Sequence, residues 1–139
     1  MSFIPKNESR FLDNAFEALM AASVVFTKHA LVKYSSGYMT NAASGDNEVE
    51  YLAMETKTDA TASNGGTKGL VVPIDDRTQF IALCSTTPVQ ATHVGNNYDI
   101  SAADTVDLGN TTDKVFHIDY ILDAANYLVV GRFNKPSID

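Results

Sequence analysis

The chain has 139 residues, of which 45% are hydrophobic and 19% are charged, and its formal net charge at pH 7 is −7. This length is sufficient for one domain with a hydrophobic core, and the composition excludes an intrinsically disordered chain. Because an acidic surface repels phosphate and the ten Lys and Arg residues are scattered singly between Lys6 and Lys135, direct binding of nucleic acid is not expected.

Long apolar runs and paired cysteines are both missing from the sequence. No run reaches the roughly 18 apolar residues of a membrane span, so no membrane segment is expected. The opening sequence MSFIPKNESRF has no basic stretch followed by an apolar one, so no secretory signal is expected. Cys84 is the single cysteine and ends an apolar run, which predicts a buried structural thiol without a disulfide partner.

The first 27 residues are predicted to form an N-terminal arm and one short helix. Phe3 and Ile4 precede Pro5 in an apolar arm that is either disordered or docked on another surface. In residues 8–22, ESRFLDNAFEALMAA, apolar side chains recur with the 3.6-residue period of one helix face. This face packs either in the chain's own core or against a partner.

The rest of the chain, residues 28–139, has the pattern of short β-strands separated by turns. Roughly nine or ten strands follow one another at spacings near ten residues, as is typical of an all-β barrel or sandwich. Ser35-Ser36-Gly37 and Gly95-Asn96-Asn97 are tight-turn sequences, and the polar stretch 57–68 is expected to be a surface loop. We therefore predict an all-β fold, a small barrel or sandwich of short antiparallel strands preceded by the arm and helix.

The strongest strand signal is the hairpin over residues 114–133, KVFHIDYILDAANYLVVGRF. Alternation in its first strand predicts one wholly apolar face, consisting of Phe116, Ile118, Tyr120 and Leu122. The opposite face is mixed and carries His117 and Asp119. The return strand is apolar on both faces apart from Arg132, so we expect it to be covered on both sides.

Candidate reactive groups are few. His117 and Asp119 could form half of a catalytic triad, but no GxSxG sequence supplies the serine, so a structural hydrogen bond is the preferred interpretation. Glu48 and Glu50 share a strand face and could flank a sugar or a cation, although charge on an edge strand also discourages aggregation. No metal-ligand spacing is present. We therefore predict no catalytic residue, cofactor or metal, and a binding or structural protein rather than an enzyme.

Four short sequences in order carry a family resemblance: LVKYSSG at 31–37, SGDNEVEYLAMET at 44–56, VGNNYDI at 94–100 and VVGRF at 129–133. They resemble the small capsid decoration, or cement, proteins of tailed phages, over about residues 28–134. The resemblance implies a β-barrel that is made in the host cytoplasm, binds the outer surface of the major capsid protein lattice and stabilises the phage head. It implies no catalytic residues.

A cement protein needs apolar anchors and an extended surface rather than a pocket. Phe3, Ile4, Phe11 and Phe16 are the predicted partner-binding anchors, with the major capsid protein as partner. Symmetric oligomers are usual for proteins bound to a lattice, so a homotrimer is expected.

Two alternatives remain open. One is a β-rich head–tail joining or tail-tube protein of a phage. The other is a carbohydrate-binding or hydrolytic β domain that uses Tyr51, Tyr98 or the Glu48/Glu50 pair, which the absence of Trp makes less favoured.

Overall fold

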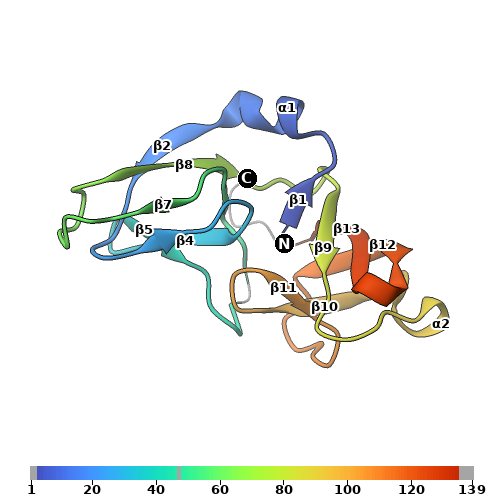
Figure 1. Ribbon diagram of the computed structural model, residues 1–139. Coiled ribbons are helices and arrows are strands. Elements are labelled where there is room, and N and C mark those ends of the chain that lie inside the picture. Colours follow the sequence, from blue (N-terminus) through green and yellow to red (C-terminus); the bar gives the residue numbers. More distant parts are fainter. Residues whose placement is uncertain (1–2, 47, 135–139) are drawn as a thin grey trace.

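The computed structural model describes residues 3–46 and 48–134, and within them the protein is mainly β, with antiparallel pairing throughout its named strands (Figure 1). The predicted all-β class is confirmed. A six-stranded sheet runs in the order β1 (Phe3–Pro5), β9 (Phe80–Leu83), β13 (Leu128–Phe133), β12 (Phe116–Asp123), β10 (Asn97–Ser101), β11 (Thr105–Asp107). The helical segments are short: α1 (Glu8–Phe11), η1 (Leu12–Asn14), α2 (Gln90–His93) and η2 (Ala124–Asn126).

The second sheet is a curled, five-stranded one. Its order is β2 (Phe16–Leu19), β8 (Lys68–Pro73), β6 (Tyr51–Ala53), β4 (Leu31–Ser35), β5 (Tyr38–Asn41). A bridge between Met20 and Met39 joins its two edges, so the sheet forms an incomplete barrel. The ribbon of β3 (Val25–Phe26) and β7 (Lys57–Thr58) adds Phe26 to the interior. That interior is made of mostly small or flexible residues: Ala18, Met20, Phe26, Val32, Met39, Ala53 and Val71.

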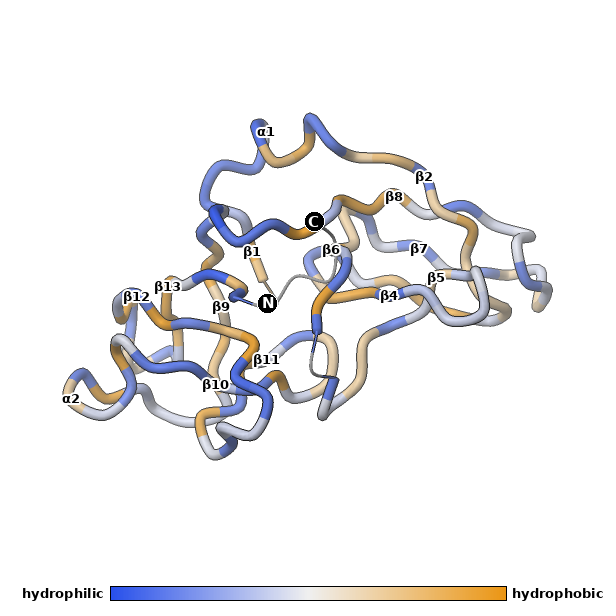
Figure 2. Tube along the Cα trace, turned by 180° about the vertical axis from the view of Figure 1, so that it is seen from behind, coloured by the Kyte–Doolittle hydropathy of each residue, from blue (hydrophilic) through white to orange (hydrophobic). Residues whose placement is uncertain are grey.

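The main core lies between the two sheets. Four phenylalanines of the six-stranded sheet pack together, with ring centroids 5.0 to 5.6 Å apart: Phe3, Phe80, Phe116 and Phe133. Leu31, Leu52 and Val72 of the five-stranded sheet belong to the same core cluster. Figure 2 shows hydrophobic residues along β4, β6 and β8. Tilted and edge-on aromatic pairs add about 0.5–1.5 kcal/mol each beyond the burial of their area.

The prediction of a helix over residues 8–22 is wrong for most of its length. Only Glu8–Phe11 is α-helical, one 3-10 turn follows at Leu12–Asn14, and Phe16–Leu19 is strand β2 paired with β8. From residue 16 to 20 the side chains alternate between the barrel interior and the surface. Over so short a stretch, the same apolar positions fit both the two-residue period of a strand and the 3.6-residue period of a helix. Pairing with β8 made this stretch a strand.

The N-terminal strand is part of the main sheet. Phe3–Pro5 pairs antiparallel with β9, and Phe3 is fully buried. Strands β1 and β2 both lie in the predicted N-terminal segment 1–27, and they pair with the chain's own two main sheets. Residues 1–2, 47 and 135–139 of the predicted ranges lie outside the described residues.

A β-bulge in β12 redirects its side chains. The register with β13 shifts between Ile118 and Tyr120, which leaves Asp119 as the extra residue. Beyond it, Tyr120 and Leu122 are exposed, whereas Ile121 packs against the core. The prediction of one apolar face along the whole strand is therefore wrong past Ile118.

The return strand β13 is covered on both faces, as predicted. Val129 and Val130 point in opposite directions from the strand, and both are fully buried.

Candidate functional site

A groove of about 640 Å³ lies where α1, the loop before β9 and the bulge of β12 meet. Its charged lining consists of Lys6, Arg10, Arg77, Arg132, Asp75 and Asp119, and we call it the cationic groove. Figure 2 shows that the segment leading into α1, which supplies Lys6 and Asn7 to the groove, is hydrophilic. Four of the ten Lys and Arg residues of an acidic chain thus line one groove.

The expectation that the basic residues do not cluster is corrected by this arrangement. Lys6 follows β1, Arg10 lies in α1, Arg77 lies in the loop before β9, and Arg132 lies in β13. They are scattered in sequence because each comes from a different element. The pairing of β9 with both β1 and β13 brings these elements together.

The bulge in β12 places the carboxylate of Asp119 in the lining of the groove. The guanidinium of Arg132 donates to both carboxylate oxygens of Asp119, from Nε at 3.1 Å and from Nη2 at 3.0 Å. Gln79 Nε2 donates to Asp119 Oδ2 at 3.0 Å. Burial acts to raise the pKa of Asp119, but the hydrogen bonds from Arg132 and Gln79 outweigh it, so the pKa lies below its ordinary value. Asp119 is therefore held as a carboxylate whose charge is neutralised by Arg132.

The second carboxylate of the groove, that of Asp75, is hydrogen-bonded to backbone N–H groups. Asp75 Oδ1 accepts from the backbone N–H groups of Arg77, at 2.9 Å, and Thr78, at 2.8 Å. Burial acts to raise the pKa of Asp75, and these hydrogen bonds lower it further than burial raises it. Asp75 thus closes the loop that presents Arg77.

The remaining basic groups differ in how far they are satisfied. Lys6 Nζ donates to the hydroxyl of Tyr120 at 2.8 Å and lies 5.5 Å from that ring's centroid. Among residues 3–46 and 48–134, no side-chain acceptor or ion-pair partner contacts the guanidinium of Arg10 or Arg77. A guanidinium has five donors in a planar fork that matches a carboxylate or a phosphate. Two such forks line one groove.

No arrangement for nucleophilic or metal-assisted catalysis is found in the part of the chain that the structure describes. His117 Nδ1 lies 2.9 Å from Asn97 Oδ1, and its Nε2 lies 3.8 Å from Asp119 Oδ1. The carboxylate of Asp119 already accepts hydrogen bonds from Arg132 and Gln79. No group of three or more His, Cys, Asp or Glu side chains in this part could hold a metal ion.

The cysteine is buried, as predicted. Burial raises the pKa of the Cys84 thiol to about 12, so the group stays protonated at neutral pH.

The four predicted anchors do not form one exposed surface. Phe3 and Phe11 are core residues with 0% and 6% of their surface exposed, so they are unavailable as anchors in this structure. Ile4 and Phe16 are half-buried and lie in different sheets. Fold-level pairing, which the sequence pattern did not reveal, placed these apolar side chains.

The residues proposed for a sugar site are also dispersed. Tyr98 is buried in the core. Tyr51 meets the rings of Phe16 and Tyr34 edge-on, at 78° and 82°, so these rings do not form a flat platform. Burial raises the pKa of Glu50, which precedes β6.

The cationic groove was missed by the sequence interpretation. The one local signal for it was the turn sequence Asp75-Asp76-Arg77-Thr78, in which a carboxylate caps a turn that carries an arginine.

No family model, curated protein or solved structure matches the chain. Among the described residues, no helix has both the length and the apolar character needed to cross a membrane.

Proposed function

We propose that the protein is a virion structural protein that binds the outer surface of a phage capsid lattice and stabilises the head. The observation that supports this most is the cationic groove on an otherwise acidic all-β body. It offers ready-made hydrogen-bond donors but pairs its carboxylates with Arg132 and with the backbone. Such a site favours binding over acid–base chemistry, which needs a free acid or base within reach of a substrate.

The fold is suited to a stabilising role. Short antiparallel strands and a main core shared by both sheets make a rigid body, and rigid surfaces lose little conformational entropy on binding. A protein that binds only the assembled lattice stabilises it by about 2.7 kcal/mol per site when its concentration is 100 times the Kd. Repetition over a shell multiplies this effect.

The edge strand β1 is protected against open-ended pairing. The N–H of Phe3 donates to the carbonyl oxygen of His29 at 2.8 Å, and Pro5 has no N–H to offer. A protein displayed in many copies on a shell benefits from such an edge, because unpaired edges template aggregation.

Co-sedimentation tests the proposed function. Purified protein is mixed with expanded capsids that lack decoration, and the pellet and the capsid melting temperature are measured. We expect saturable binding and a higher melting temperature. Binding to tail structures instead would support the head–tail alternative, and absence of capsid binding together with binding to a glycan array would overturn the proposal.

The oligomeric state is a separate prediction. The proposed homotrimer would show three times the monomer mass of 15.0 kDa in sedimentation equilibrium or on the capsid surface.

A further inference from the structure

We propose that the cationic groove binds an acidic peptide segment of the capsid protein, with the guanidinium groups of Arg10 and Arg77 binding its carboxylates. This inference rests on the proposed function, because it names the chemistry by which that partner is recognised. The proposed occupant is a polypeptide rather than a nucleic acid or a free phosphate.

The charge distribution supports an anionic occupant. Of the four basic side chains, Arg132 is neutralised by Asp119 and Lys6 donates to Tyr120. Within residues 3–46 and 48–134, no side-chain acceptor contacts the guanidinium groups of Arg10 and Arg77. Two like charges in one groove repel each other, and an anion placed between them removes that cost while gaining charge-assisted hydrogen bonds.

The neutral lining supports a polypeptide in particular. Asn7, Asn14, Thr78 and Gln79 line the same groove and provide amide and hydroxyl groups that can bond to a peptide backbone. The carboxylate of Asp119 in the same lining is neutralised by Arg132, so the neutral amides and hydroxyl carry the preference for a peptide backbone.

The net charge and the size of the groove argue against a nucleic acid. A long polyanion would approach a body with a net charge of −7, whereas a short acidic segment has to match only the groove. A volume of about 640 Å³ accommodates a few residues of an extended segment. Because the N–H groups of β1 are used or missing, the segment would be held by its side chains rather than by pairing with that edge.

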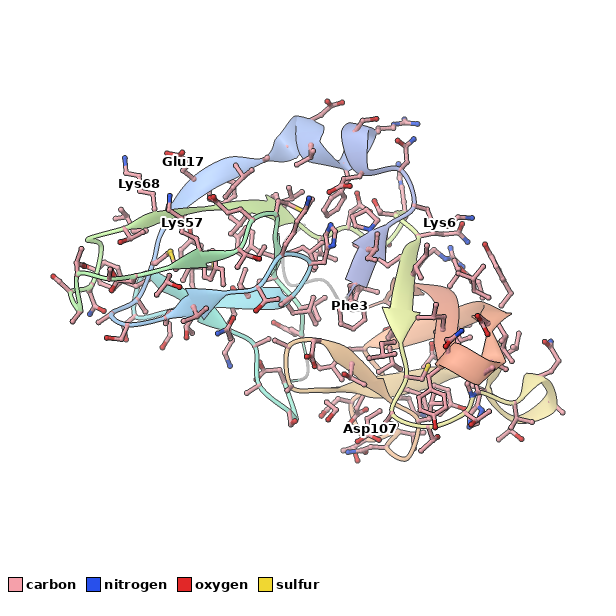
Figure 3. The ribbon with its side chains drawn as sticks, in the orientation of Figure 1. Phe3, Lys6, Glu17, Lys57, Lys68 and Asp107 are labelled. Carbon is pink, nitrogen blue, oxygen red and sulfur yellow. The ribbon has the colours of Figure 1, made fainter. Side chains whose placement is uncertain are left out.

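A pair of matched double variants tests the groove. Arg10→Gln with Arg77→Gln removes two positive charges from it. Lys57→Gln with Lys68→Gln removes two positive charges from the five-stranded sheet and its ribbon, at the opposite end of the molecule from Lys6 (Figure 3). Both variants have the same net charge, so any difference between them reports position. Thermal unfolding of each establishes that it is folded.

The first measurement uses a fluorescent hexaglutamate peptide with blocked ends, followed by anisotropy at low ionic strength. We expect binding by the wild type and by the lysine variant within about twofold, and a loss of about tenfold or more for the arginine variant, because charge-assisted bidentate contacts are the strong ones. Equal loss in both variants would overturn the proposal, as would tighter arginine-dependent binding of inorganic phosphate or of an oligothymidylate. A hexaglutamine peptide is expected not to bind.

The second measurement separates this inference from the proposed function. If the wild type and the lysine variant co-sediment with capsids and the arginine variant does not, the groove is the capsid-binding site. If all three co-sediment equally, the inference is overturned and the proposed function stands. If the wild type binds hexaglutamate through Arg10 and Arg77 but no capsid, the proposed function is overturned and the groove's preference for acidic segments stands.

Discussion

The two sheets of this protein are stabilised in different ways. The six-stranded sheet is anchored by large apolar groups, because the N-terminal strand packs Phe3 against the rings of Phe116 and Phe133, with centroids 5.6 and 5.0 Å apart. The five-stranded sheet surrounds smaller and more flexible residues, and the loop between β7 and β8 is held by the polar side chain of Asp59. Phe3 thus packs the N-terminal strand onto the sheet beside the groove. At the far end of the molecule, the carboxylate of Asp59 holds a loop through hydrogen bonds.

The Asp59 anchor satisfies several donors with one side chain. Oδ1 accepts from the backbone N–H and the hydroxyl of Thr61 and from the hydroxyl of Thr67, and Oδ2 accepts from the N–H of Ser23 at 2.8 Å. The hydrogen bonds from Thr61 and Ser23 outweigh burial and hold the pKa of Asp59 well below its ordinary value. The polar loop at 57–68 therefore has an anchor, although it lacks a large apolar residue.

The largest expected effect comes from the aromatic anchor. Replacing Phe3 by Ala leaves a cavity beside the rings of Phe116 and Phe133 and is expected to lower the free energy of unfolding by about 3–5 kcal/mol, measured by urea denaturation. The matched control is Leu122→Ala, at a side chain that is 48% exposed, and its effect should stay within about 0.5 kcal/mol. If the two variants were equally stable, Phe3 would not be an anchor of the core.

The polar anchor predicts a pH-dependent effect of smaller size. Asp59→Asn replaces an acceptor oxygen by an NH₂ group that faces donors, so the variant should be less stable at neutral pH. Because the folded pKa of Asp59 is depressed, its stabilisation is fully present above the unfolded pKa of about 3.9 and is lost as the pH falls through the folded pKa. The difference in free energy of unfolding between wild type and variant, measured by denaturation at a series of pH values, should therefore shrink below about pH 4.

Asp13→Asn is the control for that series. Asp13 is exposed and its carboxylate makes no hydrogen bond to the described residues, so its variant should follow the wild type at every pH. A constant gap for Asp59→Asn across the whole range would show that its charge is not what holds the loop.

The smallest expected change in stability comes from the groove itself. Asp119→Asn weakens the ion pair with Arg132, whose side chain is 44% exposed, so the loss should be about 0.5–1 kcal/mol. The same change frees a positive charge in the groove and should tighten hexaglutamate binding by about two- to fivefold. Asp104→Asn, at an exposed turn before β11, removes an equal charge and should leave both measurements nearly unchanged. Weaker peptide binding by Asp119→Asn would contradict the proposal that an acidic peptide binds beside Asp119 in the groove.

Sequence patterns succeeded where the signal was local and repeated. Short alternating runs and turn residues identified the all-β class, and the apolar return strand was correctly expected to be covered on both faces. The pattern failed at residues 8–22, where a few apolar positions fit both periods, and past Ile118, where one bulged residue reversed the faces of β12. Neither a bulge nor a strand partner leaves a reliable local signature.

What the sequence alone determined about this protein is its class and its balance of charge. Apolar and polar residues alternate along short runs, and an excess of carboxylates makes the body acidic. Only the tertiary structure decided that Phe3 is a core residue and that Arg10, Arg77 and Arg132 line one groove. The physical reason is that burial and charge clustering depend on which strands pair, and strand pairing joins residues far apart in the chain through contacts that no local pattern encodes.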